Sequence, residues 1–137
     1  MWIYKGTEID ETTLDNYVGF VYIITNLTSG RRYIGKKLLK FSKTKRVKGK
    51  KKKFKIASDW KTYYGSNATL LSDIEKLGQQ NFKREIIHLC QTKGECSYLE
   101  AKEQFQVDAI LSPNYYNEWI MCKISSRHLK GLYNDDF

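Results

Sequence analysis

Apolar residues fill nearly every position of the stretch VGFVYIIT, residues 18–25. Apolar side chains lie on both of its alternating faces, Phe20, Tyr22 and Ile24 on one and Val21 and Ile23 on the other, which is typical of an interior β-strand. The turn residues NLTSG follow at 26–30, and RRYIG then returns as a second strand. The pattern therefore predicts a β-hairpin that places Tyr22 and Tyr33 on neighbouring strands.

The remaining hydrophobic patterns predict two helices and one more strand. Between Asn67 and Leu77 the apolar residues recur at helical spacing, and Gly78 follows directly after the last of them. The stretch NFKREIIHLC, residues 81–90, is typical of a third strand. From Gly94 a long helix is expected to run to about Leu111, and Pro113 ends it.

Charge is concentrated in one segment between the second strand and the first helix. The chain has a formal net charge of +9, and residues 36–55 hold 12 of its 24 Lys and Arg residues and no acid. The rest of the chain, with 12 basic against 15 acidic residues, has a net charge of −3. For a cytosolic protein such a local cationic segment predicts a nucleic-acid partner. The basic candidates for binding DNA are Lys36, Lys43, Lys45, Arg46, Lys48, Lys50, Lys51, Lys52 and Lys53.

Composition narrows the class of protein further. A chain of 137 residues with 41% hydrophobic and 14% aromatic residues favours a single folded domain over a disordered tail. Its N-terminal stretch is acidic, and no apolar run is long enough for a membrane span. We therefore expect a cytoplasmic protein with no membrane association and no small-molecule cofactor.

One carboxylate on the long helix occupies an unusual position. The apolar stripe of that helix is expected to contain Tyr98, Ala101, Phe105 and Ala109, whereas Glu103 lies on the other side among Leu99, Val107 and Ile110. A carboxylate among apolar neighbours loses solvation unless a cation or a hydrogen-bond donor compensates. Either a salt bridge to a lysine or a metal site in a cleft would meet this requirement.

Taken together, these features make the sequence similar to those of the GIY-YIG nuclease family. The residues Phe20, Val21 and Tyr22 stand where the family has G-I-Y, and Tyr33, Ile34 and Gly35 match Y-I-G to the letter. The stretch KEQF, residues 102–105, stands where the family has its glutamate helix, and Asn117 in NYYNEW stands where many members have an asparagine. The resemblance covers about residues 18–119 and is strongest to small phage-borne, homing-type endonucleases. These carry a Y-x-GS element, here residues 63–66, so that Tyr64 joins the catalytic candidates.

Two departures from the family pattern stand out. The first glycine of G-I-Y is replaced by Phe20, with Gly19 displaced by one position. The arginine that usually follows Y-I-G has no clear counterpart. The cations that could replace it are Lys61, Arg46, Lys43 and Lys37, of which Lys37 stands where some relatives have a histidine.

The resemblance implies a fold and a mechanism. The fold would be α+β, a small and mostly antiparallel three-stranded sheet flanked by helices, with a basic insert at about 36–57 and a C-terminal extension at 120–137. Tyr22 would be the general base, its pKa lowered by a cation such as Lys37 or Lys61, and Tyr33 would orient the water or the phosphate. Glu103 would bind one Mg²⁺ or Mn²⁺, and Asn117 would order the glutamate helix or contact phosphate.

The sequence thus predicts a metal-dependent DNA endonuclease that leaves 5′-phosphate and 3′-hydroxyl ends. The alternative is a DNA-binding module that retains the fold without catalysis, with the lysines as an electrostatic anchor. A monomer would nick one strand, whereas a homodimer could cut both, and the sequence leaves this choice open. The resemblance also implies an origin in a phage or another mobile element acting in a bacterial host.

Overall fold

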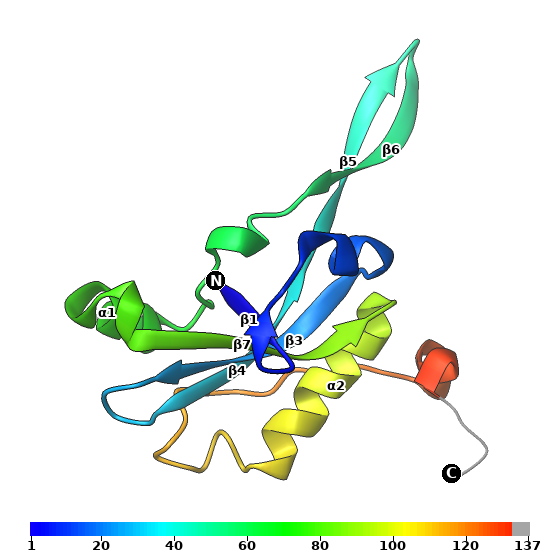
Figure 1. The fold of residues 1–137 in the computed structure, drawn as a ribbon. Coiled ribbons are helices and arrows are strands. Elements are labelled where there is room, and N and C mark those ends of the chain that lie inside the picture. The colour runs from blue at the N-terminus through cyan, green and yellow to red at the C-terminus, as the bar shows by residue number, and fades with distance from the viewer. Residues whose placement is uncertain (133–137) are drawn as a thin grey trace.

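A five-stranded sheet forms the centre of the molecule in the computed structural model, which describes residues 1–132 (Figure 1). The strands are β1 (Trp2–Tyr4), β2 (Thr7–Glu8), β3 (Gly19–Asn26), β4 (Arg32–Leu38) and β7 (Phe82–Cys90), in the spatial order β2-β1-β7-β3-β4. The pairs β3–β4 and β3–β7 are antiparallel, and β1 is parallel to β7. The sheet is therefore mixed and larger than the predicted three strands. The prediction missed β1 and β2 because strands of three and two residues carry no readable alternation.

Two α-helices and several short 3₁₀ turns complete the body. Helix α1 (Ala68–Leu77) starts where the side chain of Asn67 accepts a hydrogen bond from the backbone N–H of Leu70, and Gly78 follows its end with φ +90°. This helix confirms the prediction for residues 67–77. Helix α2 (Lys93–Gln106) is capped by Thr92 and ends earlier than expected, before a turn in which Asp108 has positive φ. The 3₁₀ turns are Glu11–Asn16, Trp60–Thr62, Gln79–Asn81 and Ser126–Leu132.

The two faces of the sheet carry different cores. On one face α2 covers a small cluster of Val21, Ile34, Cys90 and Cys96. On the other face a larger cluster joins the sheet to α1, to residues 58–66 and to the N-terminal strand; it includes Trp2, Phe20, Tyr22, Ile24, Leu70, Ile74 and Ile86. Burial of this apolar surface is the main stabilising contribution to the fold.

The buried side of α2 differs from the predicted apolar stripe. Its buried residues are Glu95, Cys96, Ala101 and Gln104, whereas Phe105 is 62% exposed. Of the predicted stripe, Ala101 and Ala109 are buried, and the prediction is wrong for Phe105 because hydrophobicity alone does not determine burial. Gln104 can be buried because its side chain donates a hydrogen bond to the Ile34 carbonyl. Phe105 borders an open groove together with Tyr98, Ile124 and Leu129.

The lysine-rich segment forms a separate two-stranded hairpin that extends away from the body (Figure 1). Its strands are β5 (Lys40–Val47) and β6 (Lys50–Ala57), and Lys48 and Gly49 between them both have positive φ, as a type I′ turn requires. Cross-strand neighbours include Lys45 opposite Lys52 and Arg46 opposite Lys51. Because like charges directly opposite one another repel, this hairpin is suited to contact with a polyanion.

The outer edge of β4 is covered by residues 114–117. The backbone N–H of Arg32 donates to the carbonyl of Asn114 (2.9 Å), and the N–H of Tyr116 donates to the carbonyl of Arg32 (2.7 Å). The Tyr116 hydroxyl donates to Asp73 of α1 and accepts from Asn26 of β3. The C-terminal segment is thereby fixed against the strand that carries Y-I-G.

Among the described residues, no helix is long and apolar enough to cross a membrane.

Candidate active site

Tyr22 and Gly35 face one another on the paired strands β3 and β4. A Cβ atom built on Gly35 would lie 2.6 Å from Tyr22 Cζ, still closer to the Tyr22 hydroxyl, and 3.0 Å from Tyr33 Cε1. Only a glycine therefore leaves room for the Tyr22 ring to pass over β4. This contact gives a physical reason for the glycine of Y-I-G in this chain.

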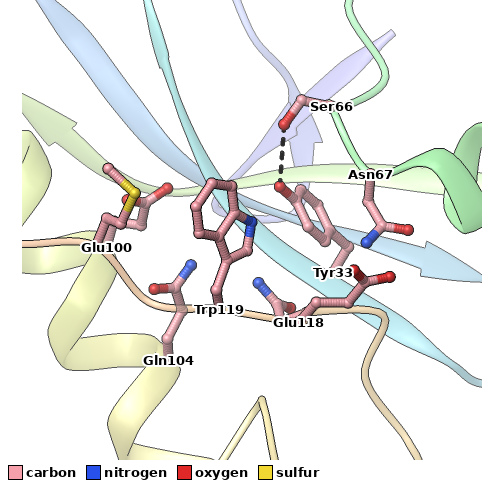
Figure 2. Close-up of a pocket in the computed structure, with 9 residues that line it drawn as sticks. Tyr33, Ser66, Asn67, Glu100, Gln104, Glu118 and Trp119 are labelled. Carbon is pink, nitrogen blue, oxygen red and sulfur yellow. Dashed lines mark hydrogen bonds between the residues drawn. The ribbon is translucent and has the colours of Figure 1, made fainter.

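Tyr33 borders a cavity of about 350 Å³ at the outer edge of β4 (Figure 2). Its hydroxyl lies 3.3 Å from Ser66 Oγ of the Y-x-GS element. Figure 2 shows Tyr33 and Ser66 on one side of Trp119 and Glu100 on the other. The residues lining the cavity are Tyr33, Ser66, Asn67, Glu100, Gln104, Asn117, Glu118, Trp119 and Met121.

Tyr22 lies behind Tyr33 and is only 1% exposed. Its ring centroid is 6.2 Å from that of Tyr33 and 6.0 Å from that of Tyr63. Burial raises the pKa of Tyr22 well above 10, and Tyr63, Tyr33 and Glu100 raise it further. Burial also raises the pKa of Tyr33, against a smaller lowering by the Ser66 hydroxyl. The expectation that a lysine lowers the pKa of Tyr22 is therefore wrong for this structure.

The two lysines proposed for that role have other partners. Lys37 Nζ lies 2.6 Å from Asp59 Oδ1 and 4.0 Å from the centroid of the Tyr63 ring, and its side chain is 11% exposed. Lys61 Nζ lies 2.9 Å from Glu11 Oε1 in a largely exposed pair. Lys37 thus supports Tyr63, which contacts Tyr22, while Lys61 points away from the cavity.

Backbone groups on the outer edge of β4 hold the polar side chains of the cavity. The Ile34 N–H donates to Asn117 Oδ1 (3.0 Å), and the Ile34 carbonyl accepts from Asn117 Nδ2 (2.8 Å) and from Gln104 Nε2 (3.0 Å). The Asn117 amide therefore takes the place of a neighbouring strand at this residue. Asn117 orders β4 through these bonds, whereas its expected roles, ordering the glutamate helix or contacting phosphate, stay predictions.

Glu100 of α2 faces the same edge two residues further along β4. Burial raises the pKa of the Glu100 carboxyl, while the charge and the backbone N–H of Lys36 oppose that rise. The Lys36 side chain itself donates to Ser97 Oγ at 2.5 Å. Lys36 therefore lies at the site beside Glu100, whereas the other lysines predicted to bind DNA lie on the hairpin.

Glu103 is not brought to the cavity. Its Oε1 accepts a hydrogen bond from His88 Nε2 of β7 at 2.8 Å, on the side of α2 away from the β4 edge. The partial desolvation predicted for Glu103 is therefore compensated by a histidine. The structure assembles Tyr33, Asn117 and the neighbouring Glu100 at one cavity, and leaves Glu103 outside it.

Tyr64 and the remaining arginine substitutes also lie elsewhere. The Tyr64 ring packs on the guanidinium of Arg84 at 4.2 Å, and Trp2 covers the same group at 4.6 Å. Arg84 is 5% exposed and donates to the carbonyls of Lys61 and Tyr63. Tyr64 thus supports the loop that positions Tyr63 and Ser66. Lys43 and Arg46 are exposed on the hairpin strand β5.

Seven residues that line the cavity are not among the site residues predicted from the sequence: Ser66, Asn67, Glu100, Gln104, Glu118, Trp119 and Met121. The spacing of Glu100 and Gln104, four residues apart on one helix, was an available signal for a shared polar face. Trp119, 71% exposed, is one of several aromatic residues that could either stack on bases or pack on the body, and the sequence does not distinguish the two. Ser66 was noted only as part of the Y-x-GS element.

The charge of the cavity limits its chemistry. Its lining residues include two carboxylates, Glu100 and Glu118, and no lysine or arginine among the described residues. Within residues 1–132 no group of three or more His, Cys, Asp or Glu side chains forms a ready metal cluster. The nearest described positive charge is that of Lys36, which lies beside Glu100 without lining the cavity.

Comparison with known proteins places the chain in a family. The family model described as "Putative endonuclease segE, GIY-YIG domain" matches residues 2–120. A protein of Enterobacteria phage T4 with the description "Putative endonuclease segE" is 34% identical over 98 residues, 72% of this chain. No solved structure matches the chain significantly.

The chain therefore belongs to the GIY-YIG endonuclease-domain family, and the resemblance found in its motifs is confirmed. The matched region corresponds to 39% of the length of the T4 protein.

Replacing Gly35 by alanine tests the contact with Tyr22. The added Cβ overlaps the Tyr22 ring, so we expect Gly35→Ala to lower the free energy of unfolding by about 1–3 kcal/mol, as overpacked substitutions do. The loss should be clearly smaller when Gly35→Ala is introduced into a Tyr22→Ala background. Urea unfolding of the four proteins measures this coupling. Additive losses would show that Tyr22 does not require the glycine.

Proposed function

We propose that this chain is a metal-dependent endonuclease that hydrolyses phosphodiester bonds of DNA. The observation that carries the proposal is the cavity at the edge of the Y-I-G strand that both Tyr33 and Glu100 line. Hydrolysis requires an activated water, neutralisation of charge on the phosphoryl oxygens and stabilisation of the leaving oxygen. The phenols meet the first need, and a divalent cation on Glu100 meets the other two.

Two features of the cavity fit a hard divalent cation. Glu100 offers a carboxylate, and Gln104 Oε1 is a buried oxygen with no hydrogen-bond partner. Mg²⁺ and Mn²⁺ prefer oxygen ligands, and Mg²⁺ commonly uses one or two protein carboxylates together with waters and substrate phosphate. Once bound, the cation would act as a Lewis acid toward the phosphate. We therefore propose Glu100, in place of Glu103, as the metal ligand.

The tyrosines keep their proposed roles in proton transfer. Tyr22 is the proposed general base, and Tyr33, which reaches the cavity, orients the water or the phosphate. Because burial and the negative Glu100 keep the pKa of Tyr22 high, a base at this position needs positive charge nearby. A metal cation bound at Glu100 would supply such a charge in addition to that of Lys36.

The products proposed are a 5′-phosphate and a 3′-hydroxyl, as the family resemblance implies. Residues 1–132 of one chain form one such cavity, so a monomer would nick one strand, and cutting of both strands would need two copies or two visits. Trp119 stands exposed at the cavity and is placed to stack on a base or pack on a sugar next to the scissile bond.

A matched pair of substitutions on α2 tests the assignment. Glu100→Gln removes the proposed metal ligand at nearly constant shape, so we expect it to abolish nicking of supercoiled plasmid with Mg²⁺ and to leave DNA affinity unchanged or higher. Glu103→Gln makes the same change outside the cavity and should cleave within a few-fold of the wild type. The wild type should lose activity in EDTA and recover it with added Mg²⁺ or Mn²⁺.

The outcomes separate this proposal from its alternatives. If Glu103→Gln loses activity and Glu100→Gln keeps it, Glu103 and not Glu100 is the metal ligand. A wild type that binds DNA and cleaves none under any divalent cation would make the chain a catalytically silent DNA-binding module.

The hairpin β5–β6 is proposed as the main DNA-contacting surface. The strand register places Phe41, Lys43, Lys45 and Val47 on one face with Lys50, Lys52, Phe54 and Ile56. At its base this face meets the active-site body, since Lys37 Nζ lies 5.2 Å from the centroid of the Phe41 ring. We call it the Lys37 face. The basic residues of the opposite face are Lys40, Arg46, Lys51, Lys53 and Lys55. A two-stranded ribbon of this kind fits the major groove of duplex DNA.

Two double variants with the same charge change test which face contacts DNA. Lys50→Ser/Lys52→Ser alters the Lys37 face, and we expect it to lower affinity for all duplex sequences alike. The slope of log affinity against log salt is negative, and each lost phosphate contact makes it less steep by about 0.9, so its magnitude should decrease by about 1.8.

The control variant Lys51→Ser/Lys53→Ser alters the opposite face and should change the slope much less. Equal effects would show that both faces contact DNA, and unchanged slopes in both variants would show that the hairpin does not bind it.

A further inference from the structure

The side chain of Gln104 is a buried amide, 4% exposed, whose NH₂ group has a hydrogen-bond partner and whose oxygen has none. Its Nε2 donates to the Ile34 carbonyl at 3.0 Å, whereas its Oε1 has no hydrogen-bond partner. Because a carbonyl can only accept, the bond to Ile34 fixes which end of the amide is NH₂ and which is oxygen. The unpartnered atom is therefore an acceptor, held in place by β4.

This oxygen belongs to the same cavity as Glu100. Glu100 and Gln104 are four residues apart on α2 and so are neighbours on one side of the helix. Figure 2 shows both side chains rising from α2, with the Gln104 amide between Glu100 and Trp119. Two oxygen acceptors thus border one space, and the nearest other amide, Asn117, is committed to Ile34.

The occupant of that space must supply donors or positive charge. A DNA phosphate offers only acceptor oxygens and would be repelled by both groups. A hydrated divalent cation offers positive charge to the carboxylate and O–H donors from its bound waters to the amide oxygen, and Mg²⁺ usually keeps several waters. Buried polar atoms without protein partners are expected to be satisfied by such a ligand.

We propose that Gln104 is a positioning residue for a hydrated Mg²⁺ or Mn²⁺ held by Glu100, and that its Oε1 accepts a hydrogen bond from a water of that cation. This inference rests on the proposed function, because it assumes the metal on Glu100. It adds a residue that links the Y-I-G strand to the cation, since the same amide donates to Ile34.

Two substitutions at Gln104 distinguish the role of its acceptor oxygen from the role of its donor NH₂ group. Gln104→Met and Gln104→Glu both lose the donor to Ile34, but only Gln104→Glu keeps an oxygen in place. The dissociation constant for Mg²⁺ is measured by ¹H–¹⁵N NMR titration without DNA. We expect Gln104→Met to weaken binding about tenfold or more, as losses of outer hydrogen bonds at metal sites do, and Gln104→Glu to bind at least as tightly as the wild type.

Gln106, exposed on the same helix and outside the cavity, provides the matched controls. Gln106→Met should leave the affinity unchanged, and Gln106→Glu shows how much an added charge alone tightens binding. In the wild type the side-chain amide signals of Gln104 should shift with Mg²⁺. Should Gln104→Met not fold, Gln104→Glu must still tighten binding more than Gln106→Glu does.

Glu100→Gln distinguishes failure of this inference from failure of the proposed function. If Glu100→Gln removes Mg²⁺ binding while Gln104→Met binds as the wild type does, the metal site stands and the role of Gln104 is wrong. If Glu100→Gln leaves Mg²⁺ binding unchanged, the metal does not lie on Glu100 and both proposals fall. Equal weakening by Gln104→Met and Gln104→Glu would show that the bond to Ile34, and not the oxygen, matters.

Discussion

The unpaired outer edge of β4 is the constraint on which the rest of the site depends. An edge strand presents backbone N–H and C=O groups that must find partners. In β4 the backbone groups on the outer edge belong to Arg32, Ile34 and Lys36, and each of these residues has different hydrogen-bond partners. Arg32 pairs with the backbone of residues 114–116, Ile34 with the amides of Asn117 and Gln104, and the Lys36 N–H faces the Glu100 carboxylate. Three polar residues of the cavity, Asn117, Gln104 and Glu100, therefore complete the sheet edge.

The side chains of β4 add the second half of the site. Tyr33 points to the face of the sheet that carries Tyr22, and Gly35 leaves the space through which the Tyr22 ring passes. The buried position of Tyr22 raises its pKa, so the phenol is a poor base in the protein alone. Negative cavity residues and high phenol pKa values have the same consequence. Both favour chemistry in which a cation bound at the cavity assists the phenols, which is the reason for the metal dependence that we propose.

Much of the fold, and the family, can be predicted from local patterns in the sequence. The hairpin with Tyr22 and Tyr33, the helix at 68–77 and the strand at 82–90 follow from alternation, turn residues and capping. The glutamate could not be chosen in this way. Glu103 looked desolvated on a helical wheel, but His88, distant in sequence, satisfies it, whereas Glu100 gains its position from the edge of β4. The extra strands and the lysine hairpin were missed because short strands and charged strands lack a hydrophobic alternation.

The most direct measurement of the central claim is the position of Mn²⁺ in a crystal of the protein, located by its anomalous scattering. We expect the main peak in contact with a Glu100 carboxylate oxygen, inside the cavity bordered by Tyr33 and Gln104. A peak at Glu103 and His88 instead, with none at Glu100, would contradict the account, because the edge of β4 would then not organise the catalytic centre.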